Sequence, residues 1–304
     1  MCGVAGVYAY HPNAPQIDRE ELIKIRDHMV SRGPDGKGEW YSSDGRVGLG
    51  HRRLSIIDLS DKASQPMVTE GDQYVISFNG EIYNYKSIRK KLEQKGYRFH
   101  SNSDTEVLLH LYADKGEAMV HDLRGMYAFT LWDKKKRAMF LVRDPYGIKP
   151  LYYADDGYTL RLTSQVKAIM ASDKMSRQEE PAGIVGFYLF GSVPEPYTIY
   201  QNIRSVPAGS YLWVDSSGAG EPIQYFSISR IWVEAELENL DGVNIFANIR
   251  DALLDSVRHH MVSDVPVGAF LSAGVDSGAL VGLMTDVLKD MGGGRPIQTI
   301  TLAF

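Results

Sequence analysis

Cys2 is the residue most open to a chemical role, because it stands one residue from the N-terminus and the 304-residue chain holds no second cysteine. A thiol attacks an amide only as a thiolate or beside a base. Removal of Met1 would place an α-amino group, which titrates near pH ~8, on Cys2 itself, where it can take the thiol proton. A lone cysteine is also a common buried hydrophobe, and position alone leaves the two interpretations open. An internal disulfide and a cysteine zinc cluster are both excluded.

Five further positions carry groups that can bind charge or donate hydrogen bonds, and each also has a plain structural interpretation. Asn79-Gly80 between apolar runs is typical of a hairpin turn, although a turn can also direct an amide and a backbone N–H toward an anion. Arg53 can be a surface charge, and Glu81 can be a solvated strand residue. Asp104 can belong to a helix cap.

Residues 270–277, Phe-Leu-Ser-Ala-Gly-Val-Asp-Ser, join an apolar strand to a helix. Small residues there let backbone N–H groups and the helix N-terminus close around a phosphate. The Gly-Lys-Ser/Thr of a Walker A loop is absent. The alternative is an ordinary strand-to-helix turn in which Asp276 or Ser277 caps the helix, and the loop alone leaves both open.

The first two-thirds of the chain predict strands interrupted by a few helices. Asp18 followed by Glu21 resembles a capping box, and the helix it opens carries Leu22, Ile25 and Met29 on one face. The other predicted helices are 85–95 and 105–115. The predicted strands are 4–10, 47–57, 74–78 and the hairpin 127–132 with 138–142, and strand signals continue to residue 214.

A loop over 215–220 precedes a change of pattern. A helix is predicted over 243–262, with one apolar stripe formed by Ile245, Ile249, Leu253 and Val257. A strand at 267–271, a helix at 277–290, a glycine break at 292–294 and a strand over 297–304 follow. This order is the opening of a parallel α/β sheet, which needs more strands to cover both faces. We therefore expect a first domain at 2–215, then a linker and an incomplete second domain at 216–304.

The composition is that of an ordinary globular protein. Hydrophobic residues make up 44% of the chain, and the net charge is −5. This charge argues against nucleic acid or an anionic membrane as a partner. No apolar run approaches the roughly 20 residues that span a bilayer, and the first residues lack the features of a signal peptide. We therefore expect a cytoplasmic protein.

Ordered sequence blocks carry a family resemblance. Met-Cys-Gly-Val-Ala-Gly at the N-terminus resembles the start of the class II glutamine amidotransferases, which are N-terminal-nucleophile hydrolases. The later blocks resemble the glutamine-dependent asparagine synthetases and follow that family's order along nearly the whole chain. They are RGPDG at 32–36, HRRLSIID at 51–58, QPM at 65–67, FNGEIYN at 78–84, SDTE at 103–106, RGMYAF at 124–129 and RDPYGIKP at 143–150.

The resemblance implies a fold and a set of roles. The first domain would be an α+β four-layer αββα sandwich, with Cys2 as the nucleophile. Arg53 would pair with the α-carboxylate of glutamine, a task suited to a guanidinium. Glu81 and Asp104 would hold its α-ammonium group. The Asn79 side chain and the Gly80 N–H would form the oxyanion hole.

For the second domain the resemblance implies an α/β ATP-pyrophosphatase with a pyrophosphate loop. Leu271 and Leu302 would lie near the adenosine of ATP, and Asp276 would help hold Mg²⁺ with the pyrophosphate. The remaining nucleotide-binding residues would be Ser272, Gly274 and Ser277. Two residues depart from the family pattern. Ala273 replaces a glycine, which puts a Cβ close to the phosphate or at a positive φ. Gln165 replaces a glutamate, which bears on the coupling of ammonia to the second domain.

The resemblance implies that glutamine is hydrolysed through a γ-glutamyl thioester, with no cofactor for that step. The ammonia would serve ATP-dependent amidation of a carboxylate, with aspartate as the expected acceptor and asparagine as the product. The same machinery acting on another carboxylate, such as a sugar uronate or a secondary metabolite, is one alternative. A non-catalytic binding or regulatory module is another, and a homodimer is a possible assembly.

Overall fold

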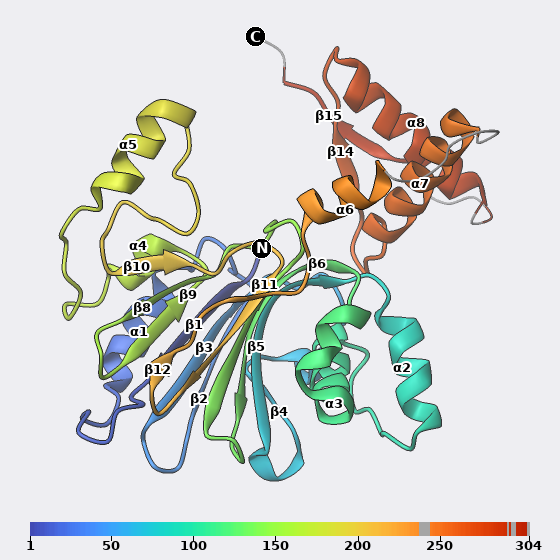
Figure 1. Ribbon diagram of the computed structural model, residues 1–304. Helices are drawn as coiled ribbons and strands as arrows, with labels where there is room; N and C mark the ends of the chain where they lie inside the picture. The colour runs from blue at the N-terminus through green and yellow to red at the C-terminus, as the bar shows by residue number, and fades with distance from the viewer. Residues whose placement is uncertain (237–243, 291, 293–295, 303–304) are drawn as a thin grey trace. The chain divides into compact units, whose positions relative to one another are not determined.

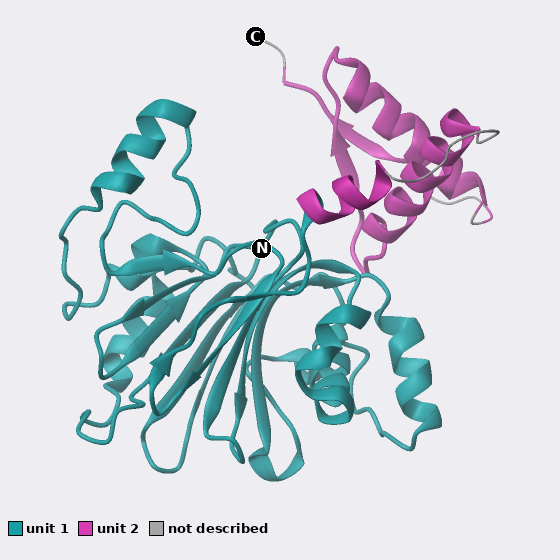
Figure 2. Ribbon diagram, in the orientation of Figure 1, with its two compact units in different colours: residues 1–228 teal, residues 229–304 magenta. Residues whose placement is uncertain are grey.

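The computed structural model describes residues 1–236, 244–290, 292 and 296–302. The chain divides into two compact units, Met1–Ile228 and Ser229–Phe304 (Figure 2). The first unit extends beyond residue 215, the expected end of the first domain, because two short strands, β12 (Gly218–Ala219) and β13 (Ile223–Gln224), pair with β11 (Ser210–Asp215). Part of the loop predicted over 215–220 is therefore a tight hairpin.

Unit 1 contains two antiparallel sheets. The six-stranded sheet has the order β10-β8-β9-β1-β3-β2, with β1 Gly3–Tyr8, β2 Gly36–Tyr41, β3 Val47–Arg53, β8 Tyr152–Asp155, β9 Leu160–Thr163 and β10 Ile203–Ser205. The seven-stranded sheet has the order β12-β11-β7-β6-β5-β4, with β13 beside β11, and its further strands are β4 Met67–Val68, β5 Tyr74–Ile82, β6 Gly125–Asp133 and β7 Ala138–Arg143.

Helices cover the outer faces of these two sheets, so unit 1 has four layers in the order αββα (Figure 1). Helices α1 (Arg19–Asp27) and α4 (Val166–Ile169) lie on the six-stranded sheet. Helix α3 (Asp104–Lys115) packs on β5, and α2 (Tyr85–Gln94) packs on α3. Short 3-10 turns occupy Asp61–Ala63, Glu70–Asp72 and Gly116–Asp122. The four-layer sandwich predicted for this unit is confirmed.

Strand β1 shows how the sequence builds these layers. Successive side chains of a strand point to opposite faces. Val4 and Tyr8 therefore enter the core between the two sheets, whereas Ala5 and Val7 pack beneath α1. Both faces of β1 are buried, which is why the strand reads as a continuous apolar run.

Helix α1 begins where the sequence indicates. The Asp18 carboxylate accepts from the N–H of Glu20 at 2.9 Å, so the predicted N-cap is confirmed. The predicted capping box is wrong, because the Glu21 carboxylate accepts instead from the Arg161 side chain at 2.6 Å and the Lys174 side chain at 2.8 Å. A buried ion pair replaces the return bond to the cap residue.

Some elements of unit 1 differ from the predictions, and one is β5, which continues to Ile82 beyond the predicted 74–78. The strand predicted over 47–57 ends at Arg53, and β2 was not predicted, because its glycines and the turn before it mask its pattern. Helix α5 (Pro181–Phe190) lies where strand signals were expected. Proline at its first turn and Gly191 at φ 73° after its end are ordinary helix boundaries that the apolar run concealed.

Unit 2 has the strand–helix–strand order of a parallel α/β sheet, as predicted. Strands β14 (Gly268–Phe270) and β15 (Gln298–Ile300) pair in parallel, and α8 (Val275–Asp290) connects them. Helix α7 (Ile245–His260) falls within the predicted 243–262, whereas α6 (Ile228–Ala235) was not predicted. Residue 243, glycines 293 and 294, and residues 303–304 of the last predicted strand lie outside the described residues.

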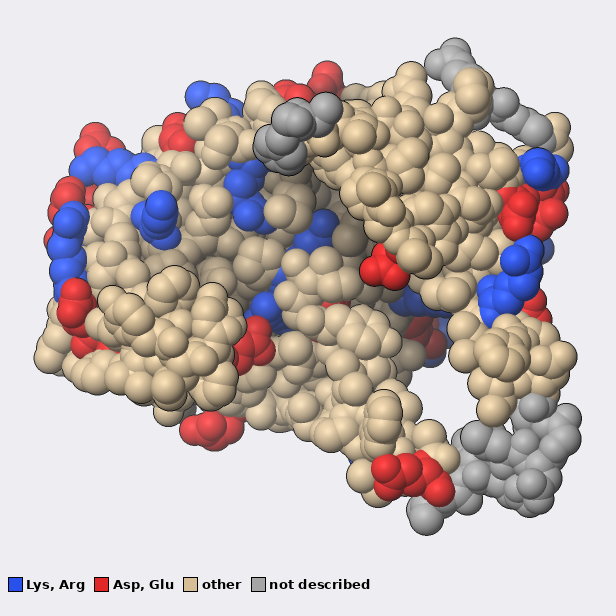
Figure 3. All heavy atoms as spheres, turned by 90° about the horizontal axis from the view of Figure 1, so that it is seen from above, with Lys and Arg blue, Asp and Glu red and all other residues tan. Residues whose placement is uncertain are grey.

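Among the helices that the structure describes, none combines the length and apolarity needed to cross a membrane. On the face of the molecule shown in Figure 3, Lys and Arg side chains lie interspersed with Asp and Glu. The chain carries a net charge of −5.

Candidate active site

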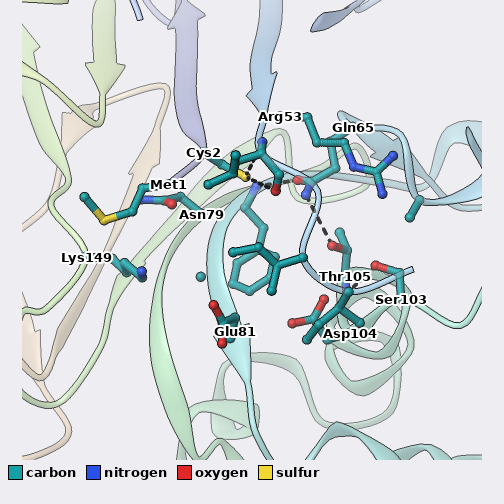
Figure 4. Close-up of a pocket in the computed structure, with 16 residues that line it drawn as sticks. Met1, Cys2, Arg53, Gln65, Asn79, Glu81, Ser103, Asp104, Thr105 and Lys149 are labelled. Carbon is teal, nitrogen blue, oxygen red and sulfur yellow. Dashed lines mark hydrogen bonds between the residues drawn. The ribbon is translucent and has the colours of Figure 1, made fainter. Parts of the chain in front are cut away.

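A pocket in unit 1 brings together all six residues predicted for the first domain, and we call it the Cys2 pocket (Figure 4). They come from the ends of β1 and β3, from the interior of β5 and from the first turn of α3. The six are Cys2, Arg53, Asn79, Gly80, Glu81 and Asp104. Segments spread over a hundred residues thus converge on a single site.

Cys2 stands immediately before β1 and lines the pocket rather than the sheet core. The N–H of Leu54 donates to its Sγ at 3.4 Å, and the Arg32 Nε donates to its backbone carbonyl at 3.0 Å. Burial raises the pKa of the Cys2 thiol, although the Leu54 hydrogen bond and the nearby chain terminus act in the opposite direction. The thiol is therefore protonated at neutral pH and needs a base before it can attack.

The hairpin-turn interpretation of Asn79-Gly80 is wrong. Both residues lie inside β5, where Asn79 pairs with Ala128 and Gly80 with Tyr127. Strand β6 provides a partner along the whole of β5, so the apolar residues on either side of Asn79-Gly80 belong to a single strand. Asn79 is 1% exposed, and its Nδ2 has no hydrogen-bond partner among the described residues. A buried amide donor without a partner is uncommon, and it calls for an acceptor in the pocket.

The backbone N–H of Gly80 points away from β6. Alternate residues of a strand direct their N–H groups to opposite edges. The N–H of Phe78 is bound by the Gln65 side chain, and that of Ile82 by the Asp104 carboxylate, both on the edge opposite β6. Gly80, midway between them, directs its N–H to the same edge. This N–H and the Asn79 amide together offer two donors on the Cys2 pocket.

Position 80 requires glycine for a steric reason as well. A Cβ on Gly80 would lie 2.2 Å from the carbonyl oxygen of Met126 and 2.7 Å from the Cα of Tyr127. Both atoms belong to the backbone of β6, which cannot move away without breaking the sheet. The strand can therefore approach its neighbour this closely only with glycine here.

Two carboxyl groups, those of Glu81 and Asp104, also line the pocket. Asp104 is 4% exposed, and its Oδ2 accepts from the N–H of Ile82 at 3.0 Å. Burial, with a smaller contribution from the neighbouring Glu81, raises its pKa to about 7. The helix cap itself is Ser103, which accepts from the N–H of Thr105. Glu81 is buried rather than solvated, so the solvated-strand interpretation is wrong.

Arg53 ends β3 and is half-buried, not an unconstrained surface charge. Its Nη1 donates to the carbonyl of Ser60 at 2.9 Å, and its Nη2 donates to the carbonyl of Asp58. These two bonds hold the guanidinium at the rim of the Cys2 pocket. A guanidinium fixed in this way retains N–H groups for a planar anion such as a carboxylate.

Gln65 and Lys149 also line the Cys2 pocket, and neither was predicted there. Lys149 is buried, and burial lowers its pKa, while Glu81 and Cys2 act in the opposite direction. The loop that carries it is held by Asp144, whose carboxylate accepts from the N–H groups of Tyr146, Ile148 and Lys149. The signal available in the sequence was the RDPYGIKP block, in which only the lysine reaches the pocket.

The 271–277 loop of unit 2 joins β14 to α8, as predicted. Ser277 organises it: its Oγ accepts from the N–H of Ser272 at 3.1 Å and donates to the carbonyl of Gly274 at 3.0 Å. The Oγ of Ser272 in turn accepts from the N–H of Gly274. Asp276 lies exposed in the first turn of α8. The loop thus presents a helix N-terminus and small residues to its surroundings.

Leu271 and Leu302 follow the carboxyl ends of two parallel strands, where nucleotides commonly bind in α/β domains. The hydroxyl of Thr301 donates to the carbonyl of Leu271 at 2.8 Å, which keeps the two segments together. Ala273 is not among the described non-glycine residues with positive φ, so its Cβ causes no backbone strain. Within the described part of the chain, no cluster of three metal-binding side chains occurs.

Gln165 begins the turn into α4 in unit 1. The Thr163 hydroxyl accepts from its N–H at 3.1 Å and donates to its carbonyl at 2.6 Å. These bonds concern the backbone alone, so position 165 does not need a particular side chain for the turn.

The two units match two different families of known proteins. Residues 1–226 match the family described as glutamine amidotransferase domain, and residues 248–304 match the family described as asparagine synthase. Asparagine synthetase (glutamine-hydrolyzing) 1 of Bacillus subtilis (strain 168) is 43% identical over 92% of this chain. Amidase chry2 of Gibberella zeae is 32% identical over 95% of it. The chain spans 43% of the length of each of these relatives.

A solved structure shares the fold. Glutamine phosphoribosylpyrophosphate amidotransferase from B. subtilis, complexed with ADP and GMP, matches 94% of this chain and 64% of its own, with a TM-score of 0.54 and 20% identity. At this identity the likeness concerns the fold alone. Unit 1 thus shares the αββα fold of this amidotransferase. The match to the glutamine amidotransferase domain family covers residues 1–226, nearly three-quarters of this chain, so the chain belongs to that family.

Proposed function

We propose that unit 1 hydrolyses glutamine to glutamate and ammonia, with Cys2 as the nucleophile. The observation that carries the proposal is the buried Asn79 Nδ2, which has no partner among the described residues and lines the same pocket as Cys2. With the Gly80 N–H directed to the same edge, the pocket offers two donors for the oxygen of a tetrahedral intermediate. A purely structural strand residue would not need to leave a buried amide unbonded.

The reaction follows from the chemistry of these groups. The Cys2 sulfur bonds to the side-chain amide carbon of glutamine while its proton passes to a base, and the carbonyl electrons move onto the oxygen. The intermediate collapses with transfer of a proton to the amide nitrogen, so that ammonia leaves and a γ-glutamyl thioester remains. Water then attacks the thioester, releasing glutamate and restoring the thiol. After removal of Met1, the α-amino group of Cys2 is the base closest to the sulfur.

The charged groups of the pocket suit the two ends of an amino acid. Arg53 would bind the α-carboxylate in a bidentate manner. Asp104 and Glu81, both buried in the pocket, would hold the α-ammonium group. The α-ammonium group would thus offset negative charge on two acidic side chains whose burial is otherwise unfavourable.

Glutamate release from glutamine tests the proposal directly. The wild-type chain should release glutamate, and Cys2→Ala should reduce release at least a thousandfold, since nothing else in the pocket can form the thioester. Glutamine binding to the variant, measured by calorimetry, should persist because the charged residues are unchanged. Release by Cys2→Ala at a rate near that of the wild type would refute the nucleophile. Intact-mass measurement of active protein that retains Met1 would refute the amine as base.

We further propose that unit 2 belongs to an ATP-dependent amide synthetase. Ser272, Gly274, Asp276 and Ser277 surround the N-terminus of α8, which suits phosphate, and the Asp276 carboxylate suits Mg²⁺ shared with phosphate oxygens. The names of the relatives support asparagine formation from aspartate, while the amidase name keeps other acceptors open. ATP with Mg²⁺ should protect the amides of the 271–277 loop from hydrogen exchange, and Asp276→Asn should weaken that protection. Equal protection in the variant would contradict the assignment.

A further inference from the structure

The edge of β5 that faces the Cys2 pocket carries three N–H groups in succession, from Phe78, Gly80 and Ile82. Beyond Ile76 the short strand β4 no longer covers this edge. Side chains bind the two outer N–H groups: Gln65 binds that of Phe78, and Asp104 binds that of Ile82. The middle N–H, from Gly80, is the one that the proposed reaction uses.

Gln65 uses both ends of its side-chain amide. Its Oε1 accepts from the N–H of Phe78 at 2.7 Å, and its Nε2 donates to the Thr105 hydroxyl at 3.3 Å. The side chain is buried, and its backbone carbonyl faces Gly38, where a Cβ would come within 2.0 Å. Gln65 is therefore fixed at its backbone and at both polar atoms of its side chain.

These contacts connect the β5 edge with the first turn of α3. Phe78 immediately precedes the donors Asn79 and Gly80, and Thr105 immediately follows Asp104. The bond from the Ile82 N–H to the Asp104 carboxylate fixes the distal end of the same stretch, residues 78–82. Without Gln65, this stretch would be fixed to α3 only at its far end, and the buried N–H of Phe78 would lose its acceptor.

We propose that Gln65 is a positioning residue for the oxyanion hole: it holds the β5 edge at Phe78 against α3, so that the Asn79 amide and the Gly80 N–H meet the developing oxyanion. This inference rests on the proposed glutamine hydrolysis. Oxyanion-hole donors are effective only when they already lie within a fraction of an ångström of the correct position before the reaction begins. Gln65 acts through its neighbours and contacts no reacting atom.

The test compares Gln65→Met with Gln73→Met. Methionine keeps the length of the side chain and removes both hydrogen bonds. Gln73, just before β5, donates to the Asp133 carboxylate at 3.2 Å and lies outside the Cys2 pocket, so it controls for the same change elsewhere in unit 1. Each variant is assayed for kcat and KM on glutamine and for inhibition by the aldehyde analogue of glutamine. That aldehyde adds the Cys2 thiol to form a tetrahedral hemithioacetal, whose oxygen takes the oxyanion position.

Gln65→Met should lower kcat by roughly 10- to 100-fold with little change in KM, because oxyanion stabilisation operates in the transition state alone. Inhibition by the aldehyde should weaken in the same proportion, and Gln73→Met should match the wild type. If Gln65→Met does not fold, Thr105→Val removes only the bond to α3 and should show a smaller loss of the same kind. Unchanged kcat, or a loss of kcat with undiminished aldehyde inhibition, would overturn the inference. A wild-type chain that releases no glutamate would overturn the proposed function instead.

Discussion

The Cys2 pocket and the 271–277 loop are held in place in different ways. The bonds that shape the pocket join residues far apart in sequence: Cys2 with Leu54, Gln65 with Thr105, and Asp104 with Ile82. The loop is held mainly by bonds between Ser272, Gly274 and Ser277, which are sequence neighbours. Asp104 is 4% exposed, whereas Phe270, just before the loop, and Val275, within it, are 74% and 86% exposed.

Contacts between distant segments determine how far water is removed from each of the two sites. Local turns give a loop its shape. The pKa of an ionisable group shifts strongly only when distant segments remove water from that group. In unit 2 the predicted apolar stripe of α7 also keeps much of its contact with water. Ile245, Ile249 and Leu253 are about half exposed, and of the four stripe residues only Val257 is buried. Removing a single hydrogen-bonding group should therefore have a large effect in the Cys2 pocket and a small effect in the 271–277 loop.

The largest effect in this comparison is expected for Asn79→Ala. Loss of one oxyanion donor should reduce kcat for glutamine hydrolysis by about 100- to 1,000-fold, with KM nearly unchanged, because the oxyanion exists only after attack. Asn79→Asp keeps the shape, removes the donor and adds a negative charge, so its kcat should be at least as low. Steady-state glutamate release measures both. A rise in KM alone, without loss of kcat, would assign Asn79 to substrate binding.

Arg53→Lys should mainly affect binding. Lysine keeps the charge and loses the two-pronged geometry, so KM for glutamine should rise by roughly tenfold while kcat changes little. Arg52→Lys is the matched control, because the Arg52 side chain pairs with Asp27 at 2.9 Å and does not line the pocket. Equal KM values for the two variants would show that Arg53 does not bind the carboxylate.

The pH dependence should show the titration of Asp104. Its pKa of about 7 means that the carboxyl group is protonated below neutral pH and cannot attract the α-ammonium of glutamine. The contribution of Asp104 to kcat/KM should therefore rise with pH, by up to about tenfold per unit below pH 7, and level off above it. Cys2, Glu81 and Lys149 face the same pocket, so Asp104→Asn is needed to separate their titration. If the pH profile of Asp104→Asn keeps the wild-type midpoint, the midpoint belongs to another group.

Stability should respond to Asp104 in the opposite direction. Its pKa in the folded chain lies above the ordinary value of 3.8, so the folded state binds the proton more tightly between pH ~4 and ~7. The contribution of Asp104 to stability is therefore full at low pH and is lost as pH rises through about 7. Thermal unfolding of wild type and Asp104→Asn across this range should diverge as pH rises, with the variant losing less. The same burial that tunes this carboxyl group for binding thus destabilises the empty pocket.

Sequence reasoning was strongest where local pattern and chemistry agree. The helix capped by Asp18, the hairpin of β6 and β7, and the β14–α8–β15 order follow from periodicity and turn residues. The six residues predicted for the Cys2 pocket come from ordered sequence blocks rather than from periodicity, and the structure brings them to one place. Their roles remain proposals.

The rest depended on long-range packing that local sequence does not encode. Asn79-Gly80 indicates a turn by itself and becomes a strand only because β6 pairs along its whole length. Gln65 reads as a loop residue, since its two partners lie 13 and 40 positions away. Lys149 reached the pocket through a loop folded around Asp144, which a linear motif does not reveal. A residue that acts through distant contacts has no local signature.

The smallest effect is expected in unit 2, for Ser277→Ala. The change removes the acceptor for the Ser272 N–H and one bond to the Gly274 carbonyl, in an exposed loop where each bond contributes about 0.5–1.5 kcal/mol. Hydrogen exchange at the Ser272 amide should therefore quicken by roughly two- to tenfold. Ser263→Ala is the matched control, since its hydroxyl accepts from the N–H of Val265 in another loop of the same unit. It should quicken exchange at Val265 and leave Ser272 as it was. A thousandfold increase at Ser272, approaching the exchange of an unstructured segment, would show that the loop depends on one side chain as strongly as the Cys2 pocket does, and the contrast between the two sites would not hold.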